Sequence, residues 1–172
     1  RYYKLPVSTD FQAYGICEDE QGHIFVGTSP AGLFMLKGDS VISVNKEYGI
    51  PEEDFFAIKY YDQSVFAATL KGVLVINLNT HNWHYITEQD GLNSELVYSL
   101  EFANHFKDLW IGTNQGINKL DLKKYLSDSK INIKAYGKLQ GFTGVECNSN
   151  GIWEDEDGSV WFGTVSGLVK HE

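Results

Sequence analysis

The residues of this chain best suited to binding a ligand are aromatic, amide and carboxylate side chains that recur at related positions. Four similar apolar segments align so that an aromatic residue or an asparagine stands two residues before the same aliphatic position in each. Aromatic faces make CH contacts with sugar rings, whereas amides and carboxylates bond hydroxyl groups in two directions. The pattern predicts a site for a small glycan-like ligand. Its candidate residues are Tyr14, Phe56, Glu95, Tyr98, Glu146, Asn148 and Asn150.

Those aromatic residues also fit a purely structural role, in which they pack neighbouring elements of the fold against one another. For each residue taken alone, packing is the commoner use of a large flat side chain. Both interpretations stay open at the level of the sequence.

No set of residues in the sequence favours catalysis or a metal centre. The five histidines do not stand at a metal-ligand spacing from a second ligand, and the serines lie in turns without a partner histidine and acid. The acidic turn at 155–158 has carboxylates of the kind that Ca²⁺ prefers but lacks the other ligands of a calcium loop, so we interpret it as a solvated hairpin turn. We therefore expect no catalytic residue, no metal and no cofactor.

The elements that must position the candidate residues follow an internal repeat. A five-residue phrase ending in Thr returns four times, and each copy is followed by a glycine and an aliphatic residue. A period of about 40 to 50 residues indicates an array of supersecondary units that bury a core only by stacking. The copies are Ile24-Phe25-Val26-Gly27-Thr28, Val65-Phe66-Ala67-Ala68-Thr69, Leu109-Trp110-Ile111-Gly112-Thr113 and Val160-Trp161-Phe162-Gly163-Thr164.

Each unit has four short segments rich in β-branched and aromatic residues and no sustained helical period. In the third unit the expected strands are 97–102, 108–113, 117–122 and 131–136. Four strands in each unit of about 40 to 45 residues describe the blade of a β-propeller. The predicted fold is all-β, a segment of about four blades, each a four-stranded antiparallel sheet. We expect one propeller segment over 1–172, divided into an outer strand of a preceding blade at 1–12, three blades at 13–54, 55–96 and 97–147, and an incomplete last blade at 148–172.

The Gly-Thr pair is expected to end the second strand of each blade. A tightly curled backbone near the propeller axis favours glycine, and the threonine hydroxyl can bond to the turn that follows. In the second unit Ala68 replaces this glycine, so a displaced strand end is expected there. Cys17 and Cys147 lie in different blades and are interpreted as small core and loop residues rather than a disulfide.

The segment is expected to belong to a larger propeller of the seven-bladed type. A four-blade arc leaves two open faces with apolar surface, so we predict self-association through these faces. The alternative is a small ring closed by residues 1–12, which would then complete the sheet of 148–172. A formal charge of -9 with scattered lysines argues against nucleic acid as a partner. No run of 18 apolar residues is present, so no direct membrane insertion of this segment is expected.

The repeats resemble the "two-component regulator propeller" repeat. The similarity covers nearly the whole chain and is carried by Gly151 to Leu168, by Asp90 to Leu100 and by the Gly-Thr-Asn-Gln-Gly run at 112–116. Proteins of this family are mostly periplasmic sensor regions of hybrid histidine kinases in Bacteroidetes, built from tandem seven-bladed propellers followed by an immunoglobulin-like domain, a membrane helix and kinase modules. The segment 139–168 is similar to the last blades before that domain.

The resemblance implies an extracytoplasmic ligand-sensing module of a two-component sensor histidine kinase, commonly for polysaccharide breakdown products. It further implies a periplasmic location as part of an inner-membrane protein, with phosphotransfer elsewhere in the polypeptide and no enzyme activity in this segment. Two alternatives remain. One is a scaffold or dimerisation propeller that binds no ligand, and the other, more distant, is a lyase-type enzymatic propeller, for which His84 and His105 are poorly placed.

Overall fold

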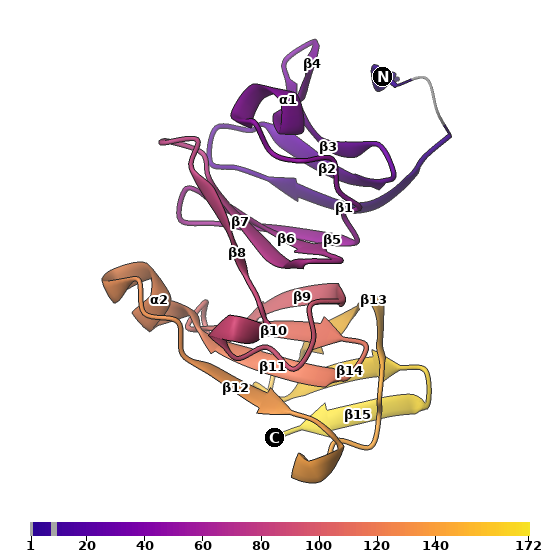
Figure 1. The fold of residues 1–172 in the computed structure, drawn as a ribbon, viewed down its shortest axis with the longest axis vertical. Helices are drawn as coiled ribbons and strands as arrows, with labels where there is room; N and C mark the ends of the chain where they lie inside the picture. The colour runs from indigo at the N-terminus through magenta and orange to yellow at the C-terminus, as the bar shows by residue number, and fades with distance from the viewer. Residues whose placement is uncertain (1, 8–9) are drawn as a thin grey trace.

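Four antiparallel sheets follow one another along the chain and stack as the blades of a β-propeller arc (Figure 1). This computed structural model describes residues 2–7 and 10–172. Three sheets have four strands and the last has three. The first blade is the sheet β1–β4, the second β5–β8, the third β9–β12 and the fourth β13–β15. In chain order the strands are β1 (Gln12–Glu18), β2 (Ile24–Ser29), β3 (Gly32–Lys37), β4 (Ser40–Ser43), β5 (Ala57–Tyr61), β6 (Ser64–Thr69), β7 (Gly72–Asn77), β8 (Trp83–Ile86), β9 (Val97–Ala103), β10 (Asp108–Thr113), β11 (Gly116–Asp121), β12 (Ile133–Tyr136), β13 (Cys147–Glu154), β14 (Val160–Thr164) and β15 (Gly167–His171).

The four copies of the repeated phrase form β2, β6, β10 and β14, and successive residues in them face different blades. In β10, Trp110 packs edge-on against Phe162 of the fourth blade, with ring centroids 5.2 Å apart. Leu109 and Ile111 point to the opposite side, into the core shared with the second blade. Because side chains alternate between the two faces of a strand, one five-residue phrase contributes residues to two separate cores, one on each side of its blade.

The glycine of the phrase is required because the inner strand of the next blade lies against it. A Cβ placed on Gly112 would lie 2.8 Å from Cβ of Cys147, and one placed on Gly27 would lie 3.0 Å from Cβ of Phe55. The second blade, which has Ala68 here, shows a regular β5–β6 ladder without the register shift that the other three inner strands have. The substitution thus coincides with a different strand end.

The threonine of each phrase closes the turn that follows it. Its hydroxyl donates to the backbone carbonyl of the turn glycine, as the sequence predicted. The donor-to-acceptor distances are 2.7 Å for Thr28, 2.9 Å for Thr69, 3.0 Å for Thr113 and 2.9 Å for Thr164.

Short helices appear where the sequence showed no helical period. α1 (Val44–Tyr48) follows the first blade's outer strand, and α2 (Leu122–Asp128) begins at Leu122, which we had expected to end a strand. The Asp121 side chain caps α2 by accepting from the backbone N–H of Lys124. Two 3₁₀ turns, η1 (Glu88–Asp90) and η2 (Lys138–Gln140), precede the third and fourth blades. The described helices are all too short and too polar to span a lipid bilayer.

The prediction of an all-β propeller segment of about four blades is confirmed. The outer strand expected at 1–12 stays a prediction, because residues 1, 8 and 9 of this segment lie outside the described part of the chain. Residues 2–7, which are described, form no strand. In the described residues β15 is the outer edge of the last sheet, and no other strand pairs with it. Closure of the sheet of 148–172 by the N-terminal residues is therefore not seen there.

Candidate functional site

Four of the candidate residues lie in local bulges near the start of the first strand of their blade. The β1–β2 ladder shifts register around Tyr14 and the β9–β10 ladder shifts around Tyr98. In the fourth blade the bulge is larger, because residues 148–151 stand opposite Gly163 alone. A bulge turns an extra side chain away from the regular alternation of the strand. Phe56 occupies the equivalent place immediately before β5.

The three aromatic rings form one continuous cluster across the first three blades. The Tyr14 and Phe56 ring centroids lie 5.8 Å apart with the planes at 57°, and those of Phe56 and Tyr98 lie 5.5 Å apart at 78°. All three side chains are half-buried. Such tilted and edge-on arrangements are favourable contacts between aromatic rings, and here they leave part of each ring at the surface. We call these three residues with Asn150 the mouth cluster.

Asn150 ties the last blade to the first two. Its side-chain nitrogen donates to the backbone carbonyls of Tyr14 at 2.7 Å and Phe56 at 3.3 Å. Its backbone has φ = 54°, in the left-handed region that asparagine tolerates better than most residues. The four aligned positions therefore do come together, and the Asn150 amide is bonded to the backbone of two of the others.

The remaining candidates lie on the segments that enter the third and fourth blades. The backbone carbonyl of Glu95 accepts from Gly72 N–H at 2.7 Å, and that of Glu146 accepts from Val165 N–H at 3.0 Å. These bonds hold both loops against the turns that join the second and third strands of the second and fourth blades. The loops therefore lie at the end of the blades that the sequence predicted. Within the described part of the chain the side chains of Glu95, Glu146 and Asn148 make no hydrogen bond or ion pair with other residues. Their oxygen and nitrogen atoms are available to a ligand.

A buried carboxylate near this end of the molecule was not anticipated from the sequence. Glu53, 8% exposed, accepts from the Tyr85 hydroxyl at 2.8 Å and forms an ion pair with Lys71. Burial raises the pKa of Tyr85, and the hydrogen bond to Glu53 and the charge of Glu53 raise it further. The only signal in the sequence is a run of three acidic residues, 52–54, after Pro51 in a loop between blades. We interpret the contacts of Glu53 with Tyr85 and Lys71 as interactions that hold that loop in place.

A large hollow in the described surface does not coincide with the mouth cluster. It measures about 690 Å³ and lies between the N-terminal segment, the turn after β2 and the loop after α1. None of the seven candidate residues lines it. Its walls include Pro6, Pro30, Phe34, Lys46 and Glu52.

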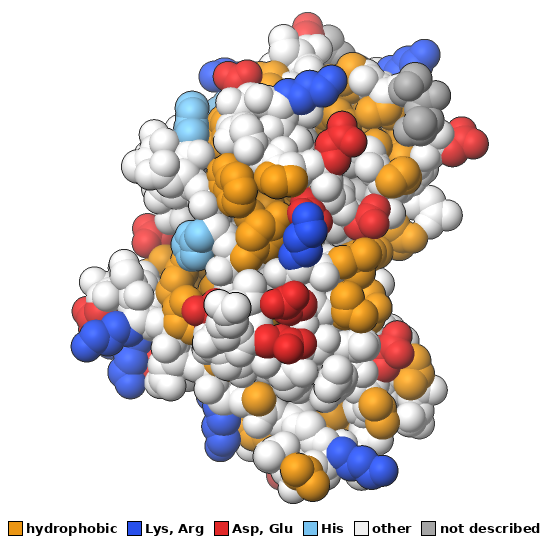
Figure 2. All heavy atoms as spheres, viewed as in Figure 1, with side chains coloured by type: hydrophobic (Ala, Val, Ile, Leu, Met, Phe, Trp, Pro, Cys, Tyr) orange, Lys and Arg blue, Asp and Glu red, His pale blue; other side chains and the backbone are white. Residues whose placement is uncertain are grey.

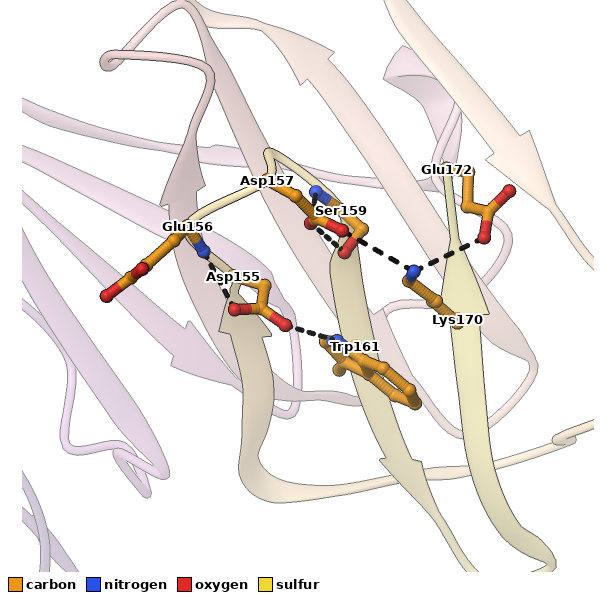
Figure 3. Close-up of polar contacts among 7 residues, drawn as sticks. All are labelled: Asp155, Glu156, Asp157, Ser159, Trp161, Lys170 and Glu172. Atoms are coloured by element: carbon orange, nitrogen blue, oxygen red, sulfur yellow. Dashed lines mark hydrogen bonds and ion pairs between the residues drawn. The ribbon is translucent and has the colours of Figure 1, made fainter.

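The acidic turn at the opposite end of the fourth blade is internally bonded (Figure 3). Asp157 accepts from the backbone N–H and the hydroxyl of Ser159, and Asp155 accepts from the Trp161 indole at 3.2 Å. Lys170 adds an ion pair to Asp157 at 3.6 Å. These bonds belong to a hairpin turn, and in the described residues no group of three or more His, Cys, Asp or Glu is arranged to hold a metal.

His23 and His84 each contact a neighbouring polar side chain. His23 Nδ1 lies 2.8 Å from the Asp19 carboxylate, where hydrogen bonds from the His23 backbone and ring outweigh burial and lower the pKa of Asp19. His84 Nε2 lies 2.8 Å from the Tyr125 hydroxyl, and burial lowers the pKa of His84. No nucleophile stands beside either ring in a described hydrogen bond. Both cysteines are free thiols, and burial raises the pKa of each to about 12.

The charged surface is mixed in sign. On the face shown in Figure 2, lysine side chains are scattered among acidic ones and do not gather in one patch. With a net charge of -9 this surface does not favour a polyanion.

Comparisons with known proteins agree with the fold. No protein-family model matches the sequence, and no curated protein matches it. Among solved structures the chain is similar to the extracellular domain assigned to the hybrid two component system BT3049 of B. thetaiotaomicron, with a TM-score of 0.76 and 18% identity over 92% of this chain and 21% of that one. The corresponding domain of BT4673 from the same organism gives a TM-score of 0.74 and 18% identity over 93% and 20%.

A third similar structure is PorZ, a surface component of the type-IX secretion system of Porphyromonas gingivalis, with a TM-score of 0.64 and 14% identity over 92% of this chain and 25% of that one. The chain thus spans a fifth to a quarter of the length of these three proteins. At this level of identity the likeness shows the propeller fold alone.

Proposed function

We propose that this chain is an extracytoplasmic ligand-sensing propeller module of a two-component sensor histidine kinase, and that it binds a small glycan-like ligand at the mouth cluster. In this proposal the module is periplasmic, belongs to an inner-membrane protein and has no catalytic role, while phosphotransfer takes place elsewhere in the polypeptide. The two neighbours from hybrid two component systems support the sensory context.

One observation carries the ligand site. Four equivalent positions from four blades converge, and three of them supply partly exposed aromatic rings in contact with one another. Glu95, Glu146 and Asn148 lie on the adjoining strand entries with side chains that no described residue engages. Partly exposed aromatic surface beside unengaged carboxylates and amides is the combination that binds a ring bearing hydroxyl groups.

The scaffold alternative has its own support. The Asn150 amide already bonds two backbone carbonyls, and the aromatic rings already pack on one another. If these contacts are the whole role of the cluster, its residues serve the junction of the blades and no ligand is required.

Calorimetric titration with a panel of plant and host oligosaccharides, preceded by a thermal-shift screen, distinguishes the two. In the sensing proposal at least one oligosaccharide binds. Glu95→Ala and Glu146→Ala then each weaken it about tenfold or more, because a hydrogen bond to a charged group contributes about 1.5 to 3 kcal/mol. Glu156→Ala, in the acidic turn at the far end of the blade, is the matched control and leaves binding unchanged. All three changes are at sites without side-chain partners, so Tm shifts of less than about 2 °C are expected.

No binding by any member of the panel, together with a large loss of stability in Tyr98→Ala and Asn150→Ala, would favour the scaffold. Binding that all three glutamate variants retain would place the ligand away from the mouth cluster.

A further inference from the structure

A second hollow lies between the second and third blades, at the opposite end of the strands from the mouth cluster. It measures about 420 Å³ and is bounded by Tyr61 at the end of β5, by the β9–β10 turn and by α2. Both blades that form it pack against a neighbouring blade on each side within this chain. The hollow therefore belongs to the interior of the arc and not to an end face. We call it the junction hollow.

The β9–β10 turn differs from the turns at the same place in the outer blades. Those turns each have a glycine with a positive φ, Gly22 at 80° and Gly158 at 83°. In the third blade Asn104, His105 and Phe106 take φ values of 55°, 55° and 60° without any glycine. A bulky side chain is unfavourable in this left-handed region, and such strain occurs preferentially at binding and active sites.

The strained turn presents an aromatic ring that the rest of the chain covers only in part. One face of Phe106 stacks on Tyr61, with ring centroids 4.6 Å apart and planes at 6°. The ring also approaches Phe102, at 5.5 Å between centroids. Even with both contacts the Phe106 side chain stays 48% exposed. The junction hollow therefore has open aromatic surface on which a flat ring or the apolar face of a sugar can lie.

α2 is a second departure of the third blade from the repeat. The third and fourth strands are joined by residues 38–39 in the first blade and 78–82 in the second, but by residues 122–132 in the third. α2 lies in this longer connection and projects from the sheet (Figure 1). An insertion in one repeat of an array commonly lies on the binding face. The aromatic turn and the inserted helix line the same hollow.

Two lysines without partners stand beside the exposed ring. Lys107 follows Phe106 in the turn, and the backbone N–H of Lys123 in α2 donates to the Lys107 carbonyl at 3.2 Å. Within the described chain neither side chain has a hydrogen-bond or ion-pair partner, whereas Lys119 and Lys124 of the same blade are paired with aspartates at 3.0 and 3.3 Å. Two unpaired ammonium groups at one hollow favour a ligand with a negative charge.

We propose that the junction hollow is a second ligand site, distinct from the mouth cluster, and that it takes a ring carrying a carboxylate. The ring lies on the exposed surface of Phe106, and Lys107 and Lys123 bind the carboxylate. Asp62, the single acidic residue of the lining, is exposed and is outnumbered by the two lysines. At the mouth cluster the unengaged charged groups are carboxylates, so the two sites select ligands of different charge.

An acidic sugar and an aromatic acid share this chemistry, and calorimetric titration of the chain with trigalacturonate and with 4-hydroxybenzoate separates them. At least one of the two binds. Its methyl ester, which keeps the ring and lacks the charge, binds at least tenfold more weakly, because a hydrogen bond to a charged group is the stronger kind. Binding of the acid also weakens as the salt concentration rises.

Single variants place the ligand. Lys107→Ala and Lys123→Ala each weaken binding of the acid about tenfold. Lys138→Ala, at an exposed lysine of η2, is the matched control and binds as the wild type does. Glu95→Ala, beside the mouth cluster, leaves binding of the acid unchanged. Loss of binding in Glu95→Ala with full binding in both lysine variants overturns the proposal, because the acid would then occupy the mouth.

Phe106→Gly separates a binding role of the ring from a packing role. Glycine adopts left-handed backbone freely, so relief of strain offsets the lost ring contacts. We expect a Tm within about 4 °C of the wild type and at least a tenfold loss of affinity for the acid. A larger fall in Tm with unchanged affinity would show that the ring serves the blade junction alone and overturns the proposal. Failure of both acids to bind the wild type overturns it as well.

Discussion

At the scale of single residues, the requirement for glycine in the repeated phrase comes from the inner strand of the next blade, which packs against it. It does not come from the conformation of the glycine's own backbone. Gly112 has no positive φ, yet its Cα hydrogens face Cys147 and Ile152 of the next blade at close range. A Cβ placed on Gly163, in the same place in the fourth blade, would have no neighbouring atom closer than 3.5 Å. The same residue in the same motif therefore carries a steric constraint in one copy and none in another.

This difference predicts unequal costs for the same substitution. Gly112→Ala should lower the free energy of unfolding by about 1 to 3 kcal/mol, because the new methyl group must displace Cys147 in a packed core. Gly163→Ala is the matched control and should change it by less than about 0.5 kcal/mol. Urea unfolding of both variants measures the difference. Equal losses in the two would mean that the backbone conformation, and not the next blade, selects glycine.

His171 should make stability depend on pH. Its ring packs edge-on against Trp110, with centroids 5.0 Å apart, and burial lowers its pKa, with help from the charges of Lys119 and Lys134. The unfolded chain then binds more protons than the folded one as the pH falls below about 6.5, so the contribution is complete above that pH and is lost on acidification.

His171→Phe keeps an aromatic ring and removes the titration. We expect the wild type to lose more unfolding free energy than this variant between pH 8 and pH 5, as measured by urea denaturation at each pH. Parallel losses in the two proteins would show that His171 is not a source of the pH dependence.

At the scale of elements, the loops between blades are held by side chains that act as additional backbone partners. Asn118, fully buried in β11, accepts from the backbone N–H of Asn93 at 3.0 Å and donates to its side-chain oxygen at 2.8 Å. The Thr113 hydroxyl, which also reaches the Gly116 carbonyl, lies within hydrogen-bond distance of the same oxygen, at 2.8 Å. Asn45 performs an equivalent task in the first blade, where it joins Leu33 N–H to the carbonyl of Pro51.

Removing the Asn118 amide should therefore cost more than an ordinary surface substitution. Asn118→Ala removes a fully buried amide and leaves the half-buried backbone N–H of Asn93 without its acceptor, and we expect a loss of about 1 to 3 kcal/mol in the free energy of unfolding. Asn79→Ala, at an exposed turn, is the control and should be near neutral. Thermal and urea unfolding of both variants supply the measurement, and a small effect at Asn118 would show that water replaces the amide.

The same elements show which features the sequence could predict. The strands built from the repeated phrase were predictable, because apolar alternation and the Gly-Thr ending recur in all four units. α1 and α2 were not, since helices of 5 and 7 residues are too short to display a helical period. The convergence of Tyr14, Phe56 and Tyr98 followed from aligning the inner strands. The inward turn of Asn150 did not, because it depends on a bulge of four residues against one, which only the paired strands reveal.

At the scale of the whole molecule, stability should be graded along the arc. The second and third blades are each packed between two neighbours, whereas the first and fourth share a core with one neighbour only. In a repeat array the stability of a unit is the sum of its own contribution and those of its nearest-neighbour interfaces. The end units should then open more often than the middle ones.

Hydrogen exchange measured by mass spectrometry should show this gradient. Every residue of β6, and nearly every residue of β7, is buried, so we expect amides of the second blade to exchange slowest. β15 is largely exposed and has an unpaired outer edge among the described strands, so its amides should exchange fastest within the regular sheets. Uniform exchange in all four blades would instead mean that the arc opens only as one cooperative unit.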